Sequence, residues 1–176
     1  SVMIVSNHYT TVENIGITTG TNVTGITVDS FLKTSGVVDT HFKNIRFSGN
    51  GYSNNGIFYY GDNSHVATTN NLESLYFWGY NTSLNISKGF IRCTNCIFEE
   101  STTGVFTNLG SWIVLDTPWF EVVTTAIHGE CGGDITVIQP KFVSVTTRFN
   151  ESTSCGYRTN YHVIGGDENW ILPRWS

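Results

Sequence analysis

A four-residue pattern (polar, apolar, variable, apolar) recurs six times along the chain, in steps of 21 to 30 residues. Its last three copies occupy residues 95–98, 117–120 and 139–142, so their final phenylalanines are 22 residues apart. A repeat of roughly 20–30 residues is typical of solenoids, in which each repeat stacks on the one before it. The residues that end the six copies are Ile17, Phe47, Phe77, Phe98, Phe120 and Phe142.

The four positions of the pattern differ in chemistry. The second is apolar or proline and the fourth is always apolar, whereas the third is mixed, which is the alternation of a strand with one buried face. The first position is always polar and is often Asn, which tolerates the left-handed backbone of a tight turn. We therefore expect a corner at the first position and stacked rungs about 4.8 Å apart.

A second apolar position follows each copy after a polar gap, and a further strand precedes each of the late copies. Three short strands for each repeat predict an all-β fold: a right-handed, single-stranded parallel β-helix, a solenoid of about six coils. We expect these coils over residues 1–156, a loop at 49–56, and an irregular, aromatic closing segment over 157–176. The second apolar position is expected at Ile26, Ile57, Ile86, Val105, Ile127 and Phe149.

Composition excludes several classes of partner. The 176-residue chain has a formal net charge of −5 and only nine Lys and Arg residues, which are scattered, so nucleic acid is not an expected partner. No apolar run approaches the ~20 residues that a membrane span needs, so no membrane insertion is expected. The chain begins at Ser1 without a visible signal peptide or capping helix, and we expect it to be a piece of a longer protein.

The cysteines do not have the spacing of a metal site. Cys93 and Cys96 form a single C-x-x-C, but the repeat places both at inward positions and no second C-x-x-C follows, so zinc is not expected. We expect four reduced, packed thiols, with a disulfide between Cys131 and Cys155 as the alternative, because these residues are about one coil apart. Neither a metal nor a cofactor is expected.

The position directly after the repeated phenylalanine holds the candidate catalytic residues. Glu99 and Glu121 occupy it in consecutive repeats, so their carboxylates are expected to lie on adjacent rungs and face solvent. Two carboxylates that close repel each other, so one is expected to hold its proton more tightly. An acid and a base arise in this way in glycoside hydrolysis. Asp116, before the corner of the same coil, is a third candidate.

Four further residues could bind a sugar on that face. Trp119 and Trp78 are expected to point to the same side as the two glutamates and to stack on sugar rings, while Tyr76 and Arg92 would add polar contacts. The alternative interpretation of the same residues is a solvated acidic face without a ligand.

The corner pattern Asn44-Ile45-Arg46-Phe47, the Thr-Thr-Gly/Ala turns and the wide aromatic loops resemble the β-helical tailspikes and receptor-binding appendages of bacteriophages. The resemblance covers residues 12–150. It implies a homotrimer that lies in the virion tail with other tail proteins after assembly in the host cytoplasm. It also implies binding of bacterial surface polysaccharide, and cleavage of it by Asp and Glu residues. The motifs of polygalacturonases and pectate lyases are missing, so no active-site residue is carried over.

Two functions are therefore compatible with the sequence. The first is a tailspike segment that binds surface polysaccharide for host attachment. In this function we also expect that the segment hydrolyses the polysaccharide, as a depolymerase of the glycosidase type. The second is a purely structural β-helix shaft or connector of a viral fibre. A surface groove lined by Trp78, Trp119, Glu99 and Glu121 would favour the first function, and burial of that face between subunits would favour the second.

Overall fold

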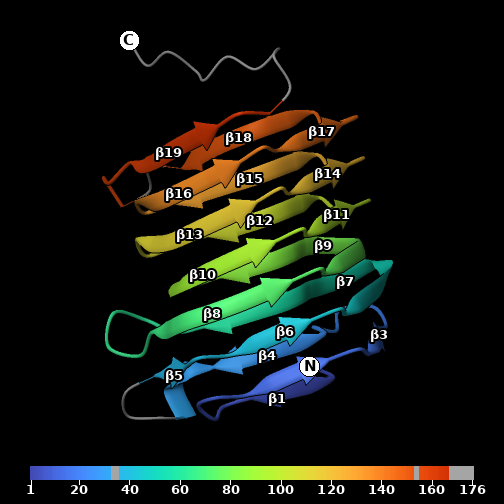
Figure 1. Cartoon of the computed structure of the whole chain (residues 1–176), viewed down its shortest axis with the longest axis vertical. Helices are drawn as coiled ribbons and strands as arrows, with labels where there is room; N and C mark the ends of the chain where they lie inside the picture. The colour runs from blue at the N-terminus through green and yellow to red at the C-terminus, as the bar shows by residue number, and fades with distance from the viewer. Residues whose placement is uncertain (33–35, 153–154, 167–176) are drawn as a thin grey trace.

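The computed structural model describes residues 1–32, 36–152 and 155–166 (Figure 1). Within these ranges the chain forms nineteen strands and one short 3-10 helix, η1 (Ser30–Leu32), and no α-helix, which confirms the all-β prediction. All of the strand pairs are parallel, and Figure 1 shows the strands stacked in tiers along the long axis. The arrangement is compatible with a β-helix or solenoid.

Two parallel sheets hold these strands. The eight-stranded sheet contains β2 (Thr11–Glu13), β5 (Val37–Val38), β6 (His41–Lys43), β8 (Ala67–Glu73), β10 (Gly89–Thr94), β13 (Ser111–Asp116), β16 (Gly133–Ile138) and β19 (Thr159–Ile164). The eleven-stranded sheet contains β1 (Met3–Val5), β3 (Gly16–Thr18), β4 (Ile26–Asp29), β7 (Arg46–Tyr60), β9 (Tyr76–Ile86), β11 (Ile97–Glu99), β12 (Thr103–Thr107), β14 (Trp119–Glu121), β15 (Thr125–Glu130), β17 (Lys141–Val143) and β18 (Thr147–Ser152).

The chain alternates between the two sheets. Strand β10 leads into β11 and β12 of the larger sheet, and the chain then returns to the smaller sheet as β13, which pairs with β10. The next passage repeats this path, with β14 on β11, β15 on β12 and β16 on β13. Each passage of the chain thus adds one strand to the smaller sheet and two strands to the larger sheet. Each of these strands pairs with the corresponding strand of the passage before it.

The corner expected at the first position of the pattern is confirmed. All six residues there have a left-handed backbone, with φ between 48° and 58°. Their amide groups donate to carbonyl groups of the neighbouring rung, for example Asn95 to Asp116 at 2.9 Å and Thr117 to Ile138 at 2.8 Å. Side chains add to this ladder, since the Asn44 amide donates to Asn14 Oδ1 at 3.1 Å. The six corner residues are Asn14, Asn44, Ser74, Asn95, Thr117 and Gln139.

The phenylalanine column forms the centre of the core, as predicted. Phe47, Phe77, Phe98 and Phe120 are fully buried, and Phe142 continues the column at partial burial. Successive ring centroids are 4.7, 5.4, 4.9 and 5.4 Å apart and the rings are parallel within 13°. The hydrophobic effect and ring stacking therefore act along the whole stack.

Two expectations about the coils are wrong. The second apolar column contains Leu84 in place of Ile86, because Leu84 pairs with both Ile57 and Val105. Leu84 follows Phe77 by seven residues, which is the spacing of the late repeats. The segment 49–56 is also not a loop, because it lies within β7. Between the paired residues Ser48 and Ser53, β7 has three residues more than β9 has between the partners of these two residues.

The prediction of four free thiols is also wrong, because disulfides join Cys93 to Cys96 and Cys131 to Cys155. Cys93 and Cys96 point inward on either side of the Asn95 corner, which leaves their Cα atoms 6.1 Å apart, and those of the second pair are 5.0 Å apart. Both separations lie within the range that a disulfide bridges.

The smaller sheet continues beyond residue 156, since β19 pairs with β16 along its whole length. The remainder of the expected closing segment, residues 167–176 with Trp170 and Trp175, lies outside the described residues. No helix in the described part of the chain is long and apolar enough to cross a membrane.

Candidate functional site

The structure brings Glu99 and Glu121 together as predicted. They are register partners on β11 and β14, and Trp78 on β9 is the next residue in the same column. Tyr76 and Trp119 lie two residues before Trp78 and Glu121 on their strands, so they point to the same side. All five side chains are partly exposed. We call this set, Tyr76, Trp78, Glu99, Trp119 and Glu121, the acidic face.

The two glutamates have different surroundings. The Tyr76 hydroxyl donates a hydrogen bond to the Glu99 carboxylate, while the Glu121 carboxylate makes no hydrogen bond or ion pair within the described residues. Burial and the hydrogen bond to the Glu99 carboxylate raise the pKa of Tyr76 to about 12, so Tyr76 remains a donor at neutral pH. The Arg46 guanidinium lies 5.0 Å from the Tyr76 ring centroid and acts in the opposite direction on that pKa.

One face of Trp119, for which the sequence suggested stacking on a sugar, is covered by a neighbouring side chain. The Lys141 ammonium group lies 3.7 Å from the centroid of its ring, which is cation–π geometry. That face of the indole is therefore occupied by a side chain of the neighbouring rung. A sugar ring could stack there only after Lys141 moves.

Asp116 and Arg92 lie on the other sheet, away from the acidic face. Asp116 ends β13 and Arg92 lies on β10, and the Arg92 guanidinium donates to the Asp116 carboxylate at 3.0 Å. The structure therefore joins these two predicted residues to each other and separates them from Glu99 and Glu121.

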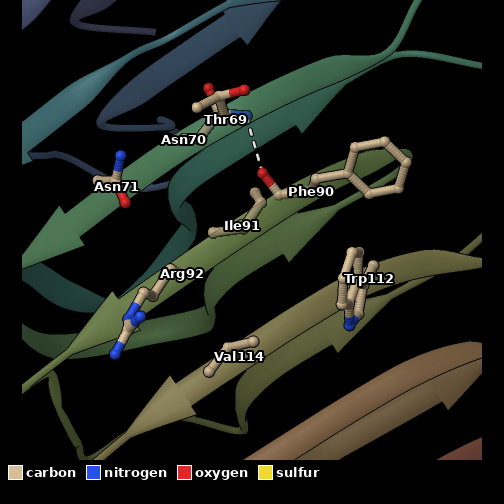
Figure 2. A pocket seen from close by; sticks show the side chains of 8 residues that line it. All are labelled: Thr69, Asn70, Asn71, Phe90, Ile91, Arg92, Trp112 and Val114. Carbon is tan, nitrogen blue, oxygen red and sulfur yellow. Dashed lines mark hydrogen bonds between the residues drawn. The ribbon is translucent and has the colours of Figure 1, made fainter.

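Two aromatic residues beside this ion pair were not identified as site residues from the sequence. Phe90 and Trp112 are register partners on β10 and β13, and their side chains are 43% and 57% exposed. The rings meet edge to face with centroids 6.1 Å apart. They border a pocket of about 170 Å³ that also includes Asn71, Arg92 and Val114 (Figure 2). We call it the aromatic pocket.

A bulge in β8 accompanies this pocket. Gly89 pairs with Ala67 but Ile91 pairs with Asn70, so β8 has two residues, Thr68 and Thr69, where β10 has only Phe90. Thr69 has a left-handed backbone, with φ of 56°. Such an extra residue bends a strand and changes the direction of its side chains.

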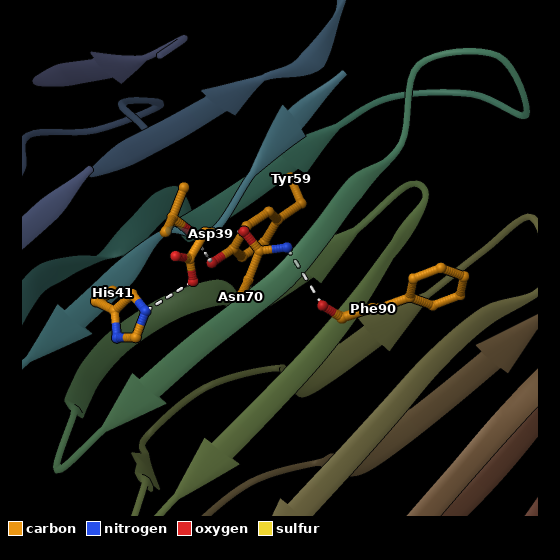
Figure 3. A network of polar contacts seen from close by, with 6 residues as sticks. Asp39, His41, Tyr59, Asn70 and Phe90 are labelled. Atoms are coloured by element: carbon orange, nitrogen blue, oxygen red, sulfur yellow. Dashed lines mark hydrogen bonds and ion pairs between the residues drawn. The ribbon is translucent and has the colours of Figure 1, made fainter. Parts of the chain in front are cut away.

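Asn70, directly after the bulge, points into the interior, where it is 1% exposed. Its Oδ1 accepts a hydrogen bond from Thr40 at 2.6 Å, and its Nδ2 donates to the Phe90 carbonyl at 3.2 Å (Figure 3). Thr40 also lies 3.5 Å from the hydroxyl of Tyr59, whose pKa is raised by complete burial. A buried and hydrogen-bonded network thus fixes the backbone of Phe90 from inside the protein.

A second hollow of about 250 Å³ adjoins the first on the same sheet and shares Asn71 with it. We call it the charged hollow. Lys43 and Glu73 form an ion pair of 3.0 Å at this hollow, and His41 contacts Asp39 at 2.8 Å. The Asn71 side chain makes no hydrogen bond within the described residues, so its amide is available to a ligand.

Strand alternation contains the signal that could have identified this site. The late repeats place Ile91, Cys93, Ile113 and Leu115 inward, so the residues between them must point outward. Phe90 and Trp112 are therefore large aromatic residues at predicted solvent positions of adjacent rungs. The bulge at Thr69 has no such signal in the repeat.

Among the residues that the structure describes, no three or more His, Cys, Asp or Glu side chains are grouped so that they could hold a metal ion. Comparisons of the chain with protein-family models, with curated proteins and with solved structures find no match, so its function has to be argued from the geometry of the chain itself.

Proposed function

We propose that this chain is a segment of a phage tailspike-type protein that binds bacterial surface polysaccharide for host attachment. In this proposal the coils form a right-handed β-helix of about six turns within a homotrimer, carried in the virion tail with other tail proteins after assembly in the host cytoplasm. The observation that carries the proposal is the pair of exposed rings, Phe90 and Trp112, above a pocket on a rigid sheet.

The chemistry of the aromatic pocket fits a sugar. A pyranose ring has an apolar face of C–H groups and a rim of hydroxyl groups, so it needs an aromatic surface and nearby hydrogen-bonding groups. Trp112 and Phe90 supply the surface, and Arg92 and Asn71 supply donors beside it. The bulge and the buried Asn70 network hold Phe90 in place, so little ordering of the site is required on binding.

The geometry favours binding without cleavage at the aromatic pocket. Two of the nearby carboxylates have cationic partners: Asp116 is paired with Arg92, and Glu73 with Lys43. A general acid needs a carboxyl group that retains its proton, and ion pairs with Arg and Lys oppose this.

Hydrolysis, if the chain performs it, belongs to the acidic face. Glu99, which accepts the hydrogen bond from Tyr76, would act as the base or the nucleophile, and Glu121 as the acid. Replacing either residue with Gln should reduce depolymerisation of capsule or O-antigen by several orders of magnitude and preserve binding. Unchanged turnover in both variants would assign the acidic face to a structural role.

Binding is tested on an array of purified bacterial capsules and O-antigens. Trp112→Ala and Phe90→Ala should each weaken binding to the best polysaccharide by about tenfold or more, as expected for aromatic residues at the centre of a site. Tyr60→Ala is the matched control, because Tyr60 is an exposed aromatic residue at the end of β7 in the other sheet. No binding to any polysaccharide, or equal losses in all three variants, would contradict the proposal and favour a structural shaft.

A further inference from the structure

One register column joins the aromatic pocket to the charged hollow. Val114 pairs with Arg92, Arg92 with Asn71, Asn71 with His41, and His41 with Thr11. The first three of these residues line the aromatic pocket and the last three line the charged hollow, with Asn71 common to both. All five are exposed or half-exposed, so the column lies on the outer face of the eight-stranded sheet.

The column is long enough for several sugar units. Five residues on successive rungs span four steps of about 4.8 Å, or about 19 Å in total. One step is close to the length that a single pyranose unit adds to a linear glycan. A chain that runs along the stack can therefore present about one ring to each rung, which a chain running along the strands cannot do.

The flanks of the column differ. Phe90 and Trp112 border one side of its upper part, and Lys43 and Glu73 border the other side lower down. The cations of this face are matched by carboxylates, because Lys43 is paired with Glu73 and Arg92 with Asp116. Glu13 adds a further negative charge at the lower end. A strongly anionic polymer would meet no unpaired Lys or Arg here, whereas hydroxyl groups can bond to these side chains and to the Asn71 amide.

We infer that the aromatic pocket and the charged hollow are two ends of one site for an uncharged, linear glycan of about five sugar units that lies along the stack axis. The inference rests on the proposed function and deepens it, since it states the length, direction and charge of the polysaccharide segment. The ring at the aromatic pocket supplies stacking, and the units beyond Asn71 are held by hydrogen bonds to polar side chains of the charged hollow.

The test uses oligosaccharides, from disaccharide to decasaccharide, prepared by partial hydrolysis of the polysaccharide that binds best on the array. Calorimetric affinity should rise with each unit up to about the pentasaccharide and then remain level. His41→Ala should weaken pentasaccharide binding by about tenfold and disaccharide binding by less than about twofold, because His41 lines the charged hollow and not the aromatic pocket. Trp112→Ala should weaken binding at every length.

The outcomes separate the inference from the proposed function. If the disaccharide binds as tightly as the pentasaccharide, or if His41→Ala has the same effect at both lengths, the extended site is wrong and the aromatic pocket alone remains. If Trp112→Ala has no effect at any length, the proposed function fails as well. The thermal stability of each variant is measured first, and Glu100→Gln, an exposed change directly after β11 of the other sheet, serves as the control.

The charge of the glycan is tested separately. Because the site offers no unpaired Lys or Arg, pentasaccharide affinity should change by less than about twofold between about 0.05 M and about 0.5 M sodium chloride. A best-binding polysaccharide that is rich in uronic acids, or a steep loss of affinity with salt, would overturn the assignment of an uncharged ligand.

Discussion

Single residues in this protein have properties set by the rung above or below them. Tyr76 is an example. Among its polar neighbours, Glu99 has the largest effect on the pKa of Tyr76, and Glu99 is its hydrogen-bond partner one rung away. The neutral phenol is favoured in the folded state, since its pKa is about 12 against an ordinary value of 10.0. The stability that Tyr76 contributes is therefore complete below pH 10.0 and is lost as the pH rises towards about 12.

The expected result for Glu99→Gln is a lower pKa of Tyr76, because the negative charge that opposes ionisation of the phenol is removed. Ultraviolet titration of tyrosinate measures this, with Tyr76→Phe to identify which step of the curve belongs to Tyr76. Tyr161 also titrates at about 12, so the assignment requires that variant. If Glu99→Gln leaves the Tyr76 step in place, the hydrogen bond between them does not persist in solution.

Val122 is a second residue whose position determines its energy. It has φ of 53° although it is β-branched, and its side chain is 53% exposed, so little packing compensates for the strain. A left-handed backbone costs about 1–2 kcal/mol for such a residue, and Asn tolerates it better. Val122→Asn should therefore raise the free energy of unfolding by about 1 kcal/mol in chemical denaturation.

Val143→Asn is the matched control for that substitution. Val143 lies in β17 and is not among the residues with positive φ, so it gains no relief from Asn. Equal stability changes at the two positions would show that the backbone at Val122 is not strained.

Elements in this fold are short, and their stability comes from stacking between rungs. Strand β14 has three residues, yet Phe120 at its centre is fully buried and stacks on Phe98 and Phe142. Phe120→Ala should cost about 3–5 kcal/mol of unfolding free energy, because it leaves a cavity within the column. Phe106→Ala, which removes a half-exposed ring from β12, should cost clearly less in the same denaturation experiment.

The elements also show what the sequence could predict. The corners and the phenylalanine column were predicted, because each depends on one residue type at a fixed spacing. The register of Glu99 with Glu121 was predicted for the same reason. Leu84 was missed although it kept the seven-residue spacing from Phe77, since Ile86 is also apolar and also points inward.

The aromatic pocket was harder to predict than the acidic face. Its shape depends on a bulge at Thr69 that breaks the repeat, and on Asn70, a polar residue at an inward position. A repeat describes what successive coils share, so it cannot indicate where one coil has an additional residue. The separation of Arg92 and Asp116 from the glutamates was not predicted. Their strands, β10 and β13, belong to the eight-stranded sheet, whereas β11 and β14 belong to the eleven-stranded sheet.

For the whole molecule, the proposed assembly gives a direct measurement. Val2, directly before β1, and Ile4 on β1 are exposed large hydrophobic residues in the isolated chain. The homotrimer we propose would cover part of such a surface. Light scattering should therefore give three times the mass of one chain, and deletion of residues 157–176 should weaken the assembly. A monomer that keeps the β-structure of residues 1–156 after this deletion would contradict the proposal.

The bulge in β8 has a consequence for how such proteins can diversify. Inserting one residue into a strand normally exchanges its inner and outer side chains. Here Asn71 and Leu72 resume the regular pairing with Arg92 and Cys93, so the disturbance ends within one rung. Ligand preference could then evolve through insertions and deletions that each change a single tier and leave the other tiers unaltered. Deleting Thr69 would be the smallest such step, and it offers protein engineers a way to close one pocket in an otherwise unchanged stack.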